Sequence, residues 1–421
     1  MKQRVVVTGL GIVAPNGVGL TNFEDALRHG KSGIRAVDAL QELNFSCTVG
    51  GIPPLSDATI SDYFTPLELR NFNNNGIIYG CIAGIDAFKD AGLQISDTPD
   101  YLTGVIFGTG TSGIEKLKES IHKIDQGNVK RLGSTAVIQT MASGVSAYLS
   151  GKLGLGNQVT TNSSACSTGT EAIIMGYDRI TAGKATRMLV GSTCEYSPYL
   201  WGGFDAMRVL NYKHNQAPEE ASRPMSMTAG GFIPGSGAGA ILLESLASAQ
   251  ERGAKIYAEV LGGSVNSGGQ RGGGSLTAPN SEAVQKCIKD ALLQADVTPN
   301  QIDLINGHLT ATVKDPVEIQ NWSEALGLKG PNFPKIQSTK SMVGHCLSAA
   351  GAVESVASLL QIYKQFMHPS INCDDVHTTI LKQIDAASIP HKTSDKGPNI
   401  IAKASFGFGD VNACVLFEKY N

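Results

Sequence analysis

The sequence predicts an α/β protein whose sheets are covered by helices on both faces. Short apolar runs rich in β-branched residues recur along the 421 residues and alternate with stretches of helical period. Charged residues make up only 17% of the chain while glycine reaches 49, a composition suited to buried sheets and close backbone approaches. The length exceeds that of one simple core, so we expect two or three domains of ordinary size.

The predicted strands fall into two series, separated by a charged helical segment at residues 245–253. The first series comprises residues 4–8, 104–107, 158–161, 188–190 and 240–243. The second series comprises residues 256–261, 302–306, 336–337, 400–404 and 413–417. Helices are predicted between them, including residues 168–181, 281–295 and 351–365. Because the pattern restarts near residue 255, we expect two halves of similar design, residues 1–254 and 255–421, although their sequences alone do not establish a duplication.

Net charge and hydropathy argue against a nucleic-acid-binding protein and against a membrane-spanning protein. Lys and Arg total 34 and Asp and Glu total 37, so the formal net charge is −3, which argues against attraction of the whole surface to nucleic acid or anionic lipid. No apolar run reaches the roughly 18 residues of a membrane span. The apolar start is broken by Gly9 and Gly11 and leads into Pro15, which predicts a buried strand and turn instead of a signal peptide. We therefore expect no nucleic-acid partner and no membrane span.

The cysteines indicate a reducing compartment. All eight lie far apart, at positions 47, 81, 166, 194, 287, 346, 373 and 414, and no two form a CxxC pair. This spacing fits neither a disulfide framework nor a zinc site. A cytoplasmic location is the natural inference.

Two glycine motifs superficially match a dinucleotide-binding fingerprint. Residues 9–14 and 108–113 both fit GxGxxG/A after a predicted strand. However, Pro15 and Asn16 interrupt any helix after the first motif, and the second lacks a clear strand ending in an acidic residue about 20 positions on. Tight turns are the better interpretation of both.

A nucleophile is predicted at Cys166, within Asn-Ser-Ser-Ala-Cys-Ser-Thr-Gly-Thr at residues 162–170. The cysteine lies between a strand-like run and a helix, hence on a sharp turn at a helix N-terminus. Unpaired N–H groups and the helix dipole favour a thiolate there, so we expect a lowered pKa. The same N–H groups could hold an oxyanion. For the other seven cysteines we expect small buried thiols.

Two histidines have comparable settings. His308 follows the predicted strand at 302–306, at the end where ligands of α/β proteins bind. His345 precedes a helix of small residues, and Lys340 lies five residues before it. A region of low charge would not bury a lysine without a partner, and Glu354 in that helix is the nearest candidate. A cysteine and two histidines on glycine-flanked turns near strand ends indicate a catalytic constellation.

A last glycine loop, Ser-Phe-Gly-Phe-Gly-Asp at residues 405–410, joins two predicted strands. Glycines there permit positive φ angles and close backbone approach. The loop is either a tight hairpin turn or a mobile aromatic gate that also presents a backbone N–H.

These motifs together resemble a β-ketoacyl-acyl-carrier-protein synthase of the elongating type, along nearly the whole chain. The resemblance rests on the first strand at 5–11, the nucleophile turn at 164–169, the central stretches at 203–208, 222–224 and 230–232, His308 with Thr310 and Thr312, the run at 338–345 with Lys340, and the loop at 405–409. All of them occur in the family's order and at its spacing.

The resemblance implies a thiolase-like fold with five layers in the order α-β-α-β-α, the first half holding the nucleophile and the second half the two histidines. It implies a decarboxylating Claisen condensation of an acyl-enzyme thioester with malonyl-acyl-carrier protein. The product would be 3-oxoacyl-acyl-carrier protein, in fatty acid, polyene or polyketide chain elongation. No metal or organic cofactor is expected, because the thioester and the loss of the carboxylate supply the driving force.

The resemblance also implies residue roles. Cys166 would take up the acyl chain, and the N–H groups of Cys166 and Phe406 would stabilise the tetrahedral oxyanion. His308 and His345 would stabilise the enolate through neutral imidazoles. Lys340 and Glu354 would orient the histidines, and Phe406 would gate the second substrate. The substrate would be bound by Phe204, Phe408, Thr310 and Thr312.

The carrier protein and a second subunit are the expected partners. Acidic carrier proteins meet basic residues near the entrance of the site. The candidates for this contact are Arg70, Arg208, Lys213 and Arg271, each of which could equally be an ordinary solvated charge. Residues 141–146 resemble the dimer-interface stretch of the family, so a dimer is expected, with itself or with a sister chain.

The chain departs from the family pattern at several places, which affects the expected substrate more than the reaction. A serine, Ser236, replaces an acidic residue between glycines, and Ser226 stands where an aspartate is usual. The acidic pair Asp315 and Glu318 lies one residue closer to the catalytic histidine, and the final glycine loop ends in Asp410 instead of glycine.

Two other functions compete with condensation. One is a non-catalytic, chain-length-determining partner subunit of a heterodimeric synthase, but such subunits commonly lack the nucleophile that Cys166 would supply. The other is a thiolase, or a Cys–His acyltransferase or hydrolase. A thiolase needs a second cysteine as base near the C-terminus, where Cys414 lies within an apolar strand instead of an exposed glycine loop.

Overall fold

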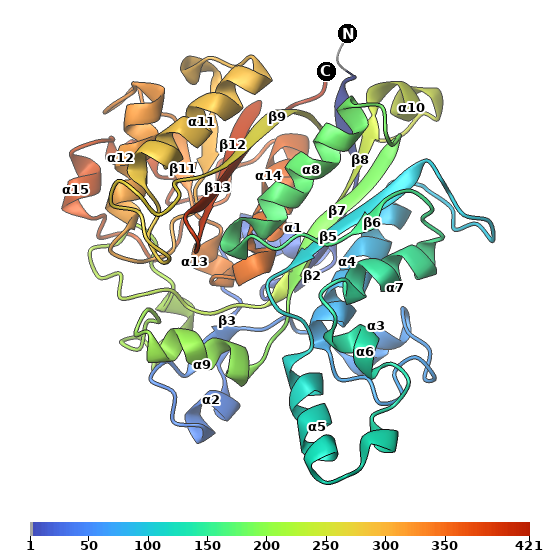
Figure 1. Cartoon of the computed structure of the whole chain (residues 1–421). Helices are drawn as coiled ribbons and strands as arrows, with labels where there is room; N and C mark the ends of the chain where they lie inside the picture. Colours follow the sequence, from blue (N-terminus) through green and yellow to red (C-terminus); the bar gives the residue numbers. More distant parts are fainter. Residues whose placement is uncertain (1–2) are drawn as a thin grey trace.

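One continuous 11-stranded sheet forms the framework of the computed structural model, which describes residues 3–421 (Figure 1). Its main path divides into two five-stranded parts with the same strand order, here called the first and the second sheet. The first sheet runs in the order β1 (Val5–Ala14), β8 (Gly237–Ser245), β7 (Arg187–Cys194), β5 (Thr103–Thr109) and β6 (Val159–Thr160). The second runs in the order β9 (Ala258–Ser267), β13 (Val411–Glu418), β12 (Ile400–Gly407), β10 (Leu304–Asn306) and β11 (Lys335–Gln337). In both sheets the last three strands are mutually parallel, and the first two run antiparallel to their neighbours.

The first strands of the two sheets, β1 and β9, correspond to each other in detail. Both have ten residues, and they pair antiparallel over residues 5–7, which joins the sheets edge to edge. Each has a bulge at its fourth residue, Thr8 in β1 against β8 and Leu261 in β9 against β13. The shared strand order, strand directions and bulge position confirm the prediction of two similar halves.

Helices complete five layers (Figure 1). The outer face of the first sheet is covered by α4 (Asn75–Asp90) and α7 (Gly144–Leu153), and that of the second by α11 (Ser281–Ala295), beside which α12 (Asp315–Leu326) packs. Between the sheets lie α8 (Thr168–Thr181) and α14 (Ala350–Lys364), which contact each other and strands of both sheets. Residues 350–362 of α14 are buried on all sides, including the polar residues Glu354, Ser358 and Gln361. The α-β-α-β-α order confirms the predicted fold class.

Shorter elements surround this core. The remaining strands are β2 (Gly17–Val18), β3 (Ile34–Ala36) and β4 (Val49–Gly51). The remaining α-helices are α1 (Leu20–Arg28), α2 (Asp38–Glu42), α3 (Asp57–Ser61), α5 (Ile114–Asp125), α6 (Ala136–Thr140), α9 (Pro198–Ala206), α10 (Leu246–Glu251), α13 (Lys340–Val343) and α15 (Thr378–Leu381). Single 3₁₀ turns are η1 (Val129–Arg131), η2 (Ala165–Ser167), η3 (Pro218–Glu220), η4 (Pro299–Gln301), η5 (Leu347–Ala349) and η6 (Ala386–Ser388). Within residues 3–421, none of the helices combines the length and apolarity needed to cross a bilayer.

The glycines of the first motif lie within a strand, so the predicted tight turn at residues 9–14 is wrong. Gly9 and Gly11 belong to β1, against which α4 packs closely. A Cβ at Gly9 would lie 2.0 Å from the carbonyl oxygen of Ala87, and one at Gly11 would lie 1.9 Å from that of Ala83. Only glycine permits this helix-to-strand approach.

Candidate active site

Cys166 lies on a strained turn that enters the central helix α8. The turn η2 follows β6, and Ala165, directly before the cysteine, has a left-handed backbone with φ of 49°. The hydroxyl of Ser167 donates to the carbonyl oxygens of Ser405 (3.1 Å) and Val411 (2.9 Å), which ties the turn to the second half of the chain. The sharp turn at a helix N-terminus expected for Cys166 is therefore present.

The two predicted histidines meet this cysteine. Nε2 of His345 lies 3.1 Å from the Sγ of Cys166, and the ring centroids of His308 and His345 are 5.4 Å apart. The three side chains come from the turns after β6, β10 and β11, so residues separated by up to 179 positions converge at one point. The structure thus brings the whole constellation together.

The predicted lowering of the thiol pKa at Cys166 is wrong for the free protein. Burial raises its pKa to about 11, because removing a thiolate from water outweighs the opposing effects of the Lys340 charge and of the backbone N–H groups of Phe408 and Cys166. A helix N-terminus alone does not offset this desolvation. The resting residue is a neutral thiol.

Both histidines are neutral as well. Burial holds the pKa of His308 and of His345 well below the usual value, and the positive charge of Lys340 lowers both further. A neutral imidazole offers one N–H donor and one acceptor nitrogen, so each ring can either accept a proton or donate a hydrogen bond.

A buried group of charges lies behind the rings. Lys340 forms an ion pair with Glu354, as its position in the sequence predicts, and the second carboxylate oxygen of Glu354 lies 2.9 Å from Nζ of Lys403. All three residues are at most 1% exposed. Lys403 was not predicted as a site residue, although a lysine within the apolar run at 400–404 is itself unusual. Within this group of three, two cations and one anion leave a formal excess of one positive charge, which favours negative charge developing in front of the histidines.

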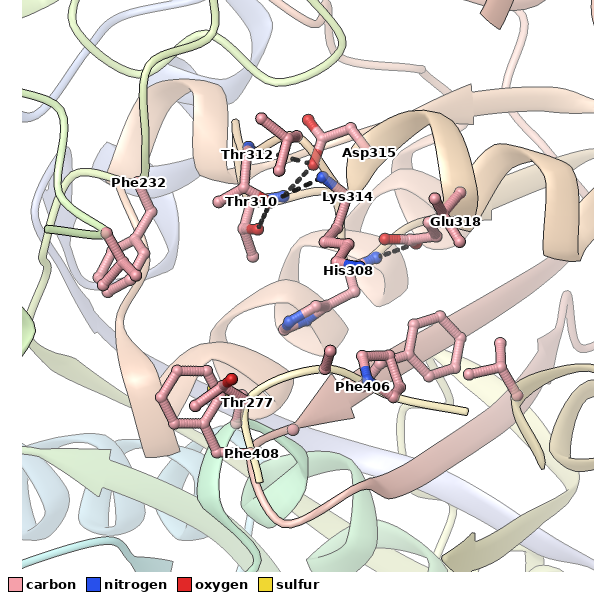
Figure 2. A pocket seen from close by; sticks show the side chains of 18 of the residues that line it. Phe232, Thr277, His308, Thr310, Thr312, Lys314, Asp315, Glu318, Phe406 and Phe408 are labelled. Atoms are coloured by element: carbon pink, nitrogen blue, oxygen red, sulfur yellow. Dashed lines mark hydrogen bonds between the residues drawn. The ribbon is translucent and has the colours of Figure 1, made fainter. Parts of the chain in front are cut away.

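Two carboxylates at the start of α12 fix the loop that bears His308 (Figure 2). Glu318 accepts the backbone N–H of His308 (2.6 Å) and that of Leu309 (2.7 Å). Asp315 accepts the N–H groups of Thr310 (3.0 Å) and of the residue after it (3.1 Å). Burial raises the pKa of Asp315 to about 6 and that of Glu318 to about 7. The shortened loop noted in the sequence is thus anchored along its backbone.

The phenylalanine whose N–H acts on the sulfur is Phe408, which corrects the prediction for Phe406. The N–H of Phe408 is among the groups that lower the pKa of Cys166, and a Cβ at Gly407 would lie 3.1 Å from the backbone nitrogen of that cysteine. Phe406 is the last but one residue of β12 and packs its ring against His308, with centroids 6.1 Å apart. Because the loop contains two Phe-Gly pairs, the sequence did not distinguish them.

A cavity of about 540 Å³ opens in front of Cys166, His308 and His345. All four predicted substrate-binding residues line it: Phe204, Phe408, Thr310 and Thr312. The rings of Phe408 and Phe204 (6.1 Å between centroids), of Phe204 and Phe232 (5.5 Å), and of Phe232 and His345 (5.2 Å) form a continuous aromatic wall. Phe232 was not predicted as a site residue, although its motif at 230–232 was noticed. The lining is largely apolar, which suits an apolar ligand.

The predicted docking residues divide into two groups. Arg208 lies between two cavity-lining residues, Met207 and Val209, and Arg271 precedes two others, Gly272 and Gly273. Arg70 and Lys213 are exposed but are not part of the cavity lining. Lys314, which sequence analysis missed, lines the cavity and is exposed (Figure 2). Three cations therefore adjoin or line the cavity.

The serines that depart from the family pattern have structural partners. The Ser226 hydroxyl donates to the carboxylate of Asp375 (2.6 Å), and Ser236 is buried with its hydroxyl 3.4 Å from the carbonyl oxygen of Gly51. Neither residue lines the cavity. Nothing in these contacts connects the two serines to the chemistry.

Metal binding and thiolase chemistry are two other uses of these residue types. The donor atoms of Cys166, His308 and His345 lie within 4.8 Å of one another, and all are types that bind zinc. A zinc ion would take Cys166 as a thiolate ligand and so occupy the sulfur that is predicted to act as the nucleophile. Cys414, the alternative base of a thiolase, is buried in β13, where burial raises its pKa well above the usual value.

Comparison with known proteins agrees with this site. Models of the β-ketoacyl synthase N-terminal domain and C-terminal domain match residues 2–249 and 257–374. The chain is 33% identical over 422 residues to 3-oxoacyl-[acyl-carrier-protein] synthase 1 of Haemophilus influenzae, covering 100% of both chains. It superposes with a TM-score of 0.90 on a β-ketoacyl synthase from Burkholderia phymatum, at 26% identity and 100% coverage of both chains. A type II polyketide ketosynthase solved in complex with its acyl-carrier protein gives a TM-score of 0.88 at 27% identity, with both chains fully covered.

The five-layer fold and the Cys–His–His site define a condensing enzyme of the acyltransferase class with a thiolase-like fold. Within that class, the chain belongs to the β-ketoacyl synthase family.

Proposed function

We propose that the protein catalyses the decarboxylating condensation of an acyl group held on Cys166 with malonyl-acyl-carrier protein, giving 3-oxoacyl-acyl-carrier protein. The observation that carries this proposal is the 3.1 Å contact between the Sγ of Cys166 and Nε2 of His345, at the end of a cavity that His308 also lines. A non-catalytic partner subunit would have no use for this arrangement.

Acyl transfer is the first step. The Sγ of Cys166 attacks the thioester carbonyl of an acyl-carrier protein while its proton passes to Nε2 of His345, so that no free thiolate accumulates despite the high pKa of the thiol. The tetrahedral oxyanion is held by the N–H groups of Cys166 and Phe408. The C–S bond to the carrier then breaks, and His345 returns the proton to the carrier sulfur.

Condensation is the second step. Malonyl-acyl-carrier protein takes the place of the first carrier, its C–CO₂ bond breaks to release CO₂, and the electron pair moves to the thioester carbonyl oxygen. That oxygen accepts hydrogen bonds from His308 and from His345, whose neutral ring now carries its proton on Nε2 after proton exchange with water. The resulting carbon nucleophile attacks the acyl carbonyl on Cys166, the C–S bond breaks, and the leaving thiolate takes up a proton from water to restore the thiol. Neutral rings suit this role because they donate without first losing a proton, and the excess positive charge of Lys340, Lys403 and Glu354 supports the enolate.

The remaining roles follow from position. Phe406 was predicted to gate the second substrate, but its ring is buried against His308, so we assign the gate to Phe408, which lines the cavity and whose N–H faces the sulfur. Thr310 and Thr312 bind the amide-bearing arm of the carrier. Arg208, Arg271 and Lys314 meet the acidic carrier at the cavity, while Arg70 and Lys213 have a weaker basis in the structure.

A dimer and a division into two halves complete the proposal. The first sheet ends at the edge strand β6, whose Val159 is 42% exposed, and α5 exposes Leu117, Ile121 and Ile124 along one face. A second copy or a sister chain would cover these surfaces.

We place the boundary of the halves at residues 254 and 255, between α10 and β9. Within residues 3–421, which hold all eight cysteines, each thiol is free, which supports a cytoplasmic location.

Intact-mass measurement after mixing with acyl-carrier protein tests the function. One acyl adduct is expected on the wild type and on Cys373→Ala, a control that removes a buried thiol away from the cavity, and none on Cys166→Ala. An adduct that persists in Cys166→Ala would refute the mechanism. A panel of acyl chains of different length, scored by product formation, then assigns the preferred substrate.

A further inference from the structure

Asp410 is the residue at which the final glycine loop departs most from its family. It follows Gly409, is fully buried, and has a left-handed backbone with φ of 64°. Aspartate adopts this conformation more readily than most residues but less readily than glycine. A buried carboxylate must have partners, and those partners identify what the residue does.

The partners all lie in one segment, residues 268–280. One carboxylate oxygen of Asp410 accepts the backbone N–H of Asn280 (2.8 Å), and the other accepts that of Gln270 (2.9 Å). The main-chain carbonyl of Asp410 accepts the N–H of Gly268 (3.1 Å), and the neighbouring Gly409 donates to the carbonyl oxygen of Leu276 (2.8 Å). Bonds to the loop at 405–410 therefore hold this segment at both ends and near its middle.

The glycine-rich composition of the segment fits this carboxylate. A Cβ at Gly268 would lie 2.2 Å from Oδ2 of Asp410, and one at Gly274 would lie 2.5 Å from the same atom. Larger residues at either place would push the carboxylate out. The aspartate and the glycine-rich segment, two separate oddities of the sequence, thus form one arrangement.

Both connected segments form walls of the cavity. Residues 272, 273 and 277–279 of the first segment line it, as do residues 406–408 of the second (Figure 2). Of residues 268–280, only Asn280 is buried, so the segment has little apolar packing to hold it. Hydrogen bonds to a charged acceptor are stronger than neutral ones and are well suited to this task.

We propose that Asp410 is a positioning residue whose carboxylate latches the 268–280 wall to the loop of Phe408, and that this latch sets how tightly the cavity holds carrier-borne substrates. The identity of those substrates rests on the function proposed above. The latched wall contains no group that touches the reacting atoms, and the hydroxyl of Ser167 holds the loop of Phe408 independently, through the carbonyl oxygens of Ser405 and Val411. Loss of the latch should therefore weaken binding and leave the chemical step nearly unchanged.

Hydrogen-exchange mass spectrometry tests the latch without any substrate. In Asp410→Gly, peptides covering 268–280 should exchange about tenfold faster or more, because two charge-assisted bonds are lost. Gln270→Ala is the matched control, since it keeps the backbone N–H that Asp410 accepts, and it should exchange as the wild type does. Unchanged exchange in Asp410→Gly would overturn the latch.

Steady-state kinetics test its consequence. In Asp410→Gly we expect the KM for malonyl-acyl-carrier protein to rise roughly three- to tenfold with kcat within about twofold, and Asp410→Asn, which keeps one acceptor oxygen, to fall between. Gly268→Ala, whose methyl group displaces the carboxylate, should reproduce the effect if Asp410→Gly folds poorly. A fall in kcat at unchanged KM, or no kinetic change, would overturn the positioning role. A wild type that forms no acyl adduct would instead refute the proposed function, and the exchange result would stand.

Discussion

The two halves of the molecule share one architecture but differ in the chemistry that they hold at the same place. In the first half the chain leaves β6 and enters α8 through η2; in the second it leaves β11, forms the short helix α13 and enters α14 through η5. Each 3₁₀ turn begins with a non-glycine residue in the left-handed region, Ala165 with φ of 49° and Leu347 with φ of 50°. The backbone has therefore built the same strained turn twice, facing one cavity.

The side chains on these turns separate the two roles of the reaction. The first half contributes the thiol of Cys166 without an ionised group beside it, while the second contributes both histidines and the buried charges of Lys340, Lys403 and Glu354. The nucleophilic thiol thus lies on the first half and the hydrogen-bond donors lie on the second half. They meet only where the two halves face each other at the cavity. The shared backbone arrangement therefore determines the position of the site, and the residue types on each turn determine which half supplies the nucleophile and which supplies the donors.

Removing a donor from the second half should produce the largest difference between the two half-reactions. His308→Ala should lower decarboxylation of malonyl-acyl-carrier protein by about 10²–10³-fold, since an N–H to the enolate oxygen is lost, while acylation of Cys166 falls far less. Carbon dioxide release and the intact mass of the acyl-enzyme measure the two steps separately. Decarboxylation at the wild-type rate in His308→Ala would remove its enolate role.

The fold could be predicted closely because its pattern is local. The helices at 168–181 and 281–295 end at the predicted residues, and each predicted strand overlaps an observed one, since apolar β-branched runs and helical periods are written into neighbouring residues. The convergence of Cys166, His308 and His345 was also predictable, because each follows a strand end or precedes a helix.

What could not be predicted depends on distant contacts. The thiol pKa follows from burial by both halves, which outweighs the local helix N-terminus. Lys403 looks like a strand residue until Glu354 of a different element is placed beside it. The choice between Phe406 and Phe408 depends on where a hairpin turns relative to Cys166, a matter of about two residues.

The pH dependence of Cys166 alkylation would sharpen the contrast between a neutral first half and a charged second half. A pKa raised from 9.0 to about 11 keeps the group as a thiol at neutral pH, so the rate with iodoacetamide should still rise about tenfold per pH unit between pH 7 and 9.5. At pH 7 to 8 the rate should be about a hundredfold below that of an unperturbed thiol, and this gap should narrow as the pH passes 9, where the unperturbed thiol is already half ionised. Cys166→Ser supplies the background from the other cysteines. If the alkylation rate instead reached a plateau below pH 8, Cys166 and His345 would already form a thiolate–imidazolium pair. The site residue of the first half would then be charged and not neutral.

The smallest effect concerns the strands that the halves have in common. Gly9 and Gly262 are both the fifth residue of a ten-residue first strand, but a Cβ at Gly9 would lie 2.0 Å from a backbone oxygen of α4, whereas one at Gly262 would lie 3.2 Å from the end of α11. Gly9→Ala should therefore cost about 3 kcal/mol of unfolding free energy, because a helix must move, and Gly262→Ala about 1 kcal/mol or less. Urea unfolding of the two variants beside the wild type measures both costs. Equal losses of unfolding free energy in the two variants would mean that α11 packs on β9 as tightly as α4 packs on β1. The two halves would then not differ in how closely their helices approach the first strand.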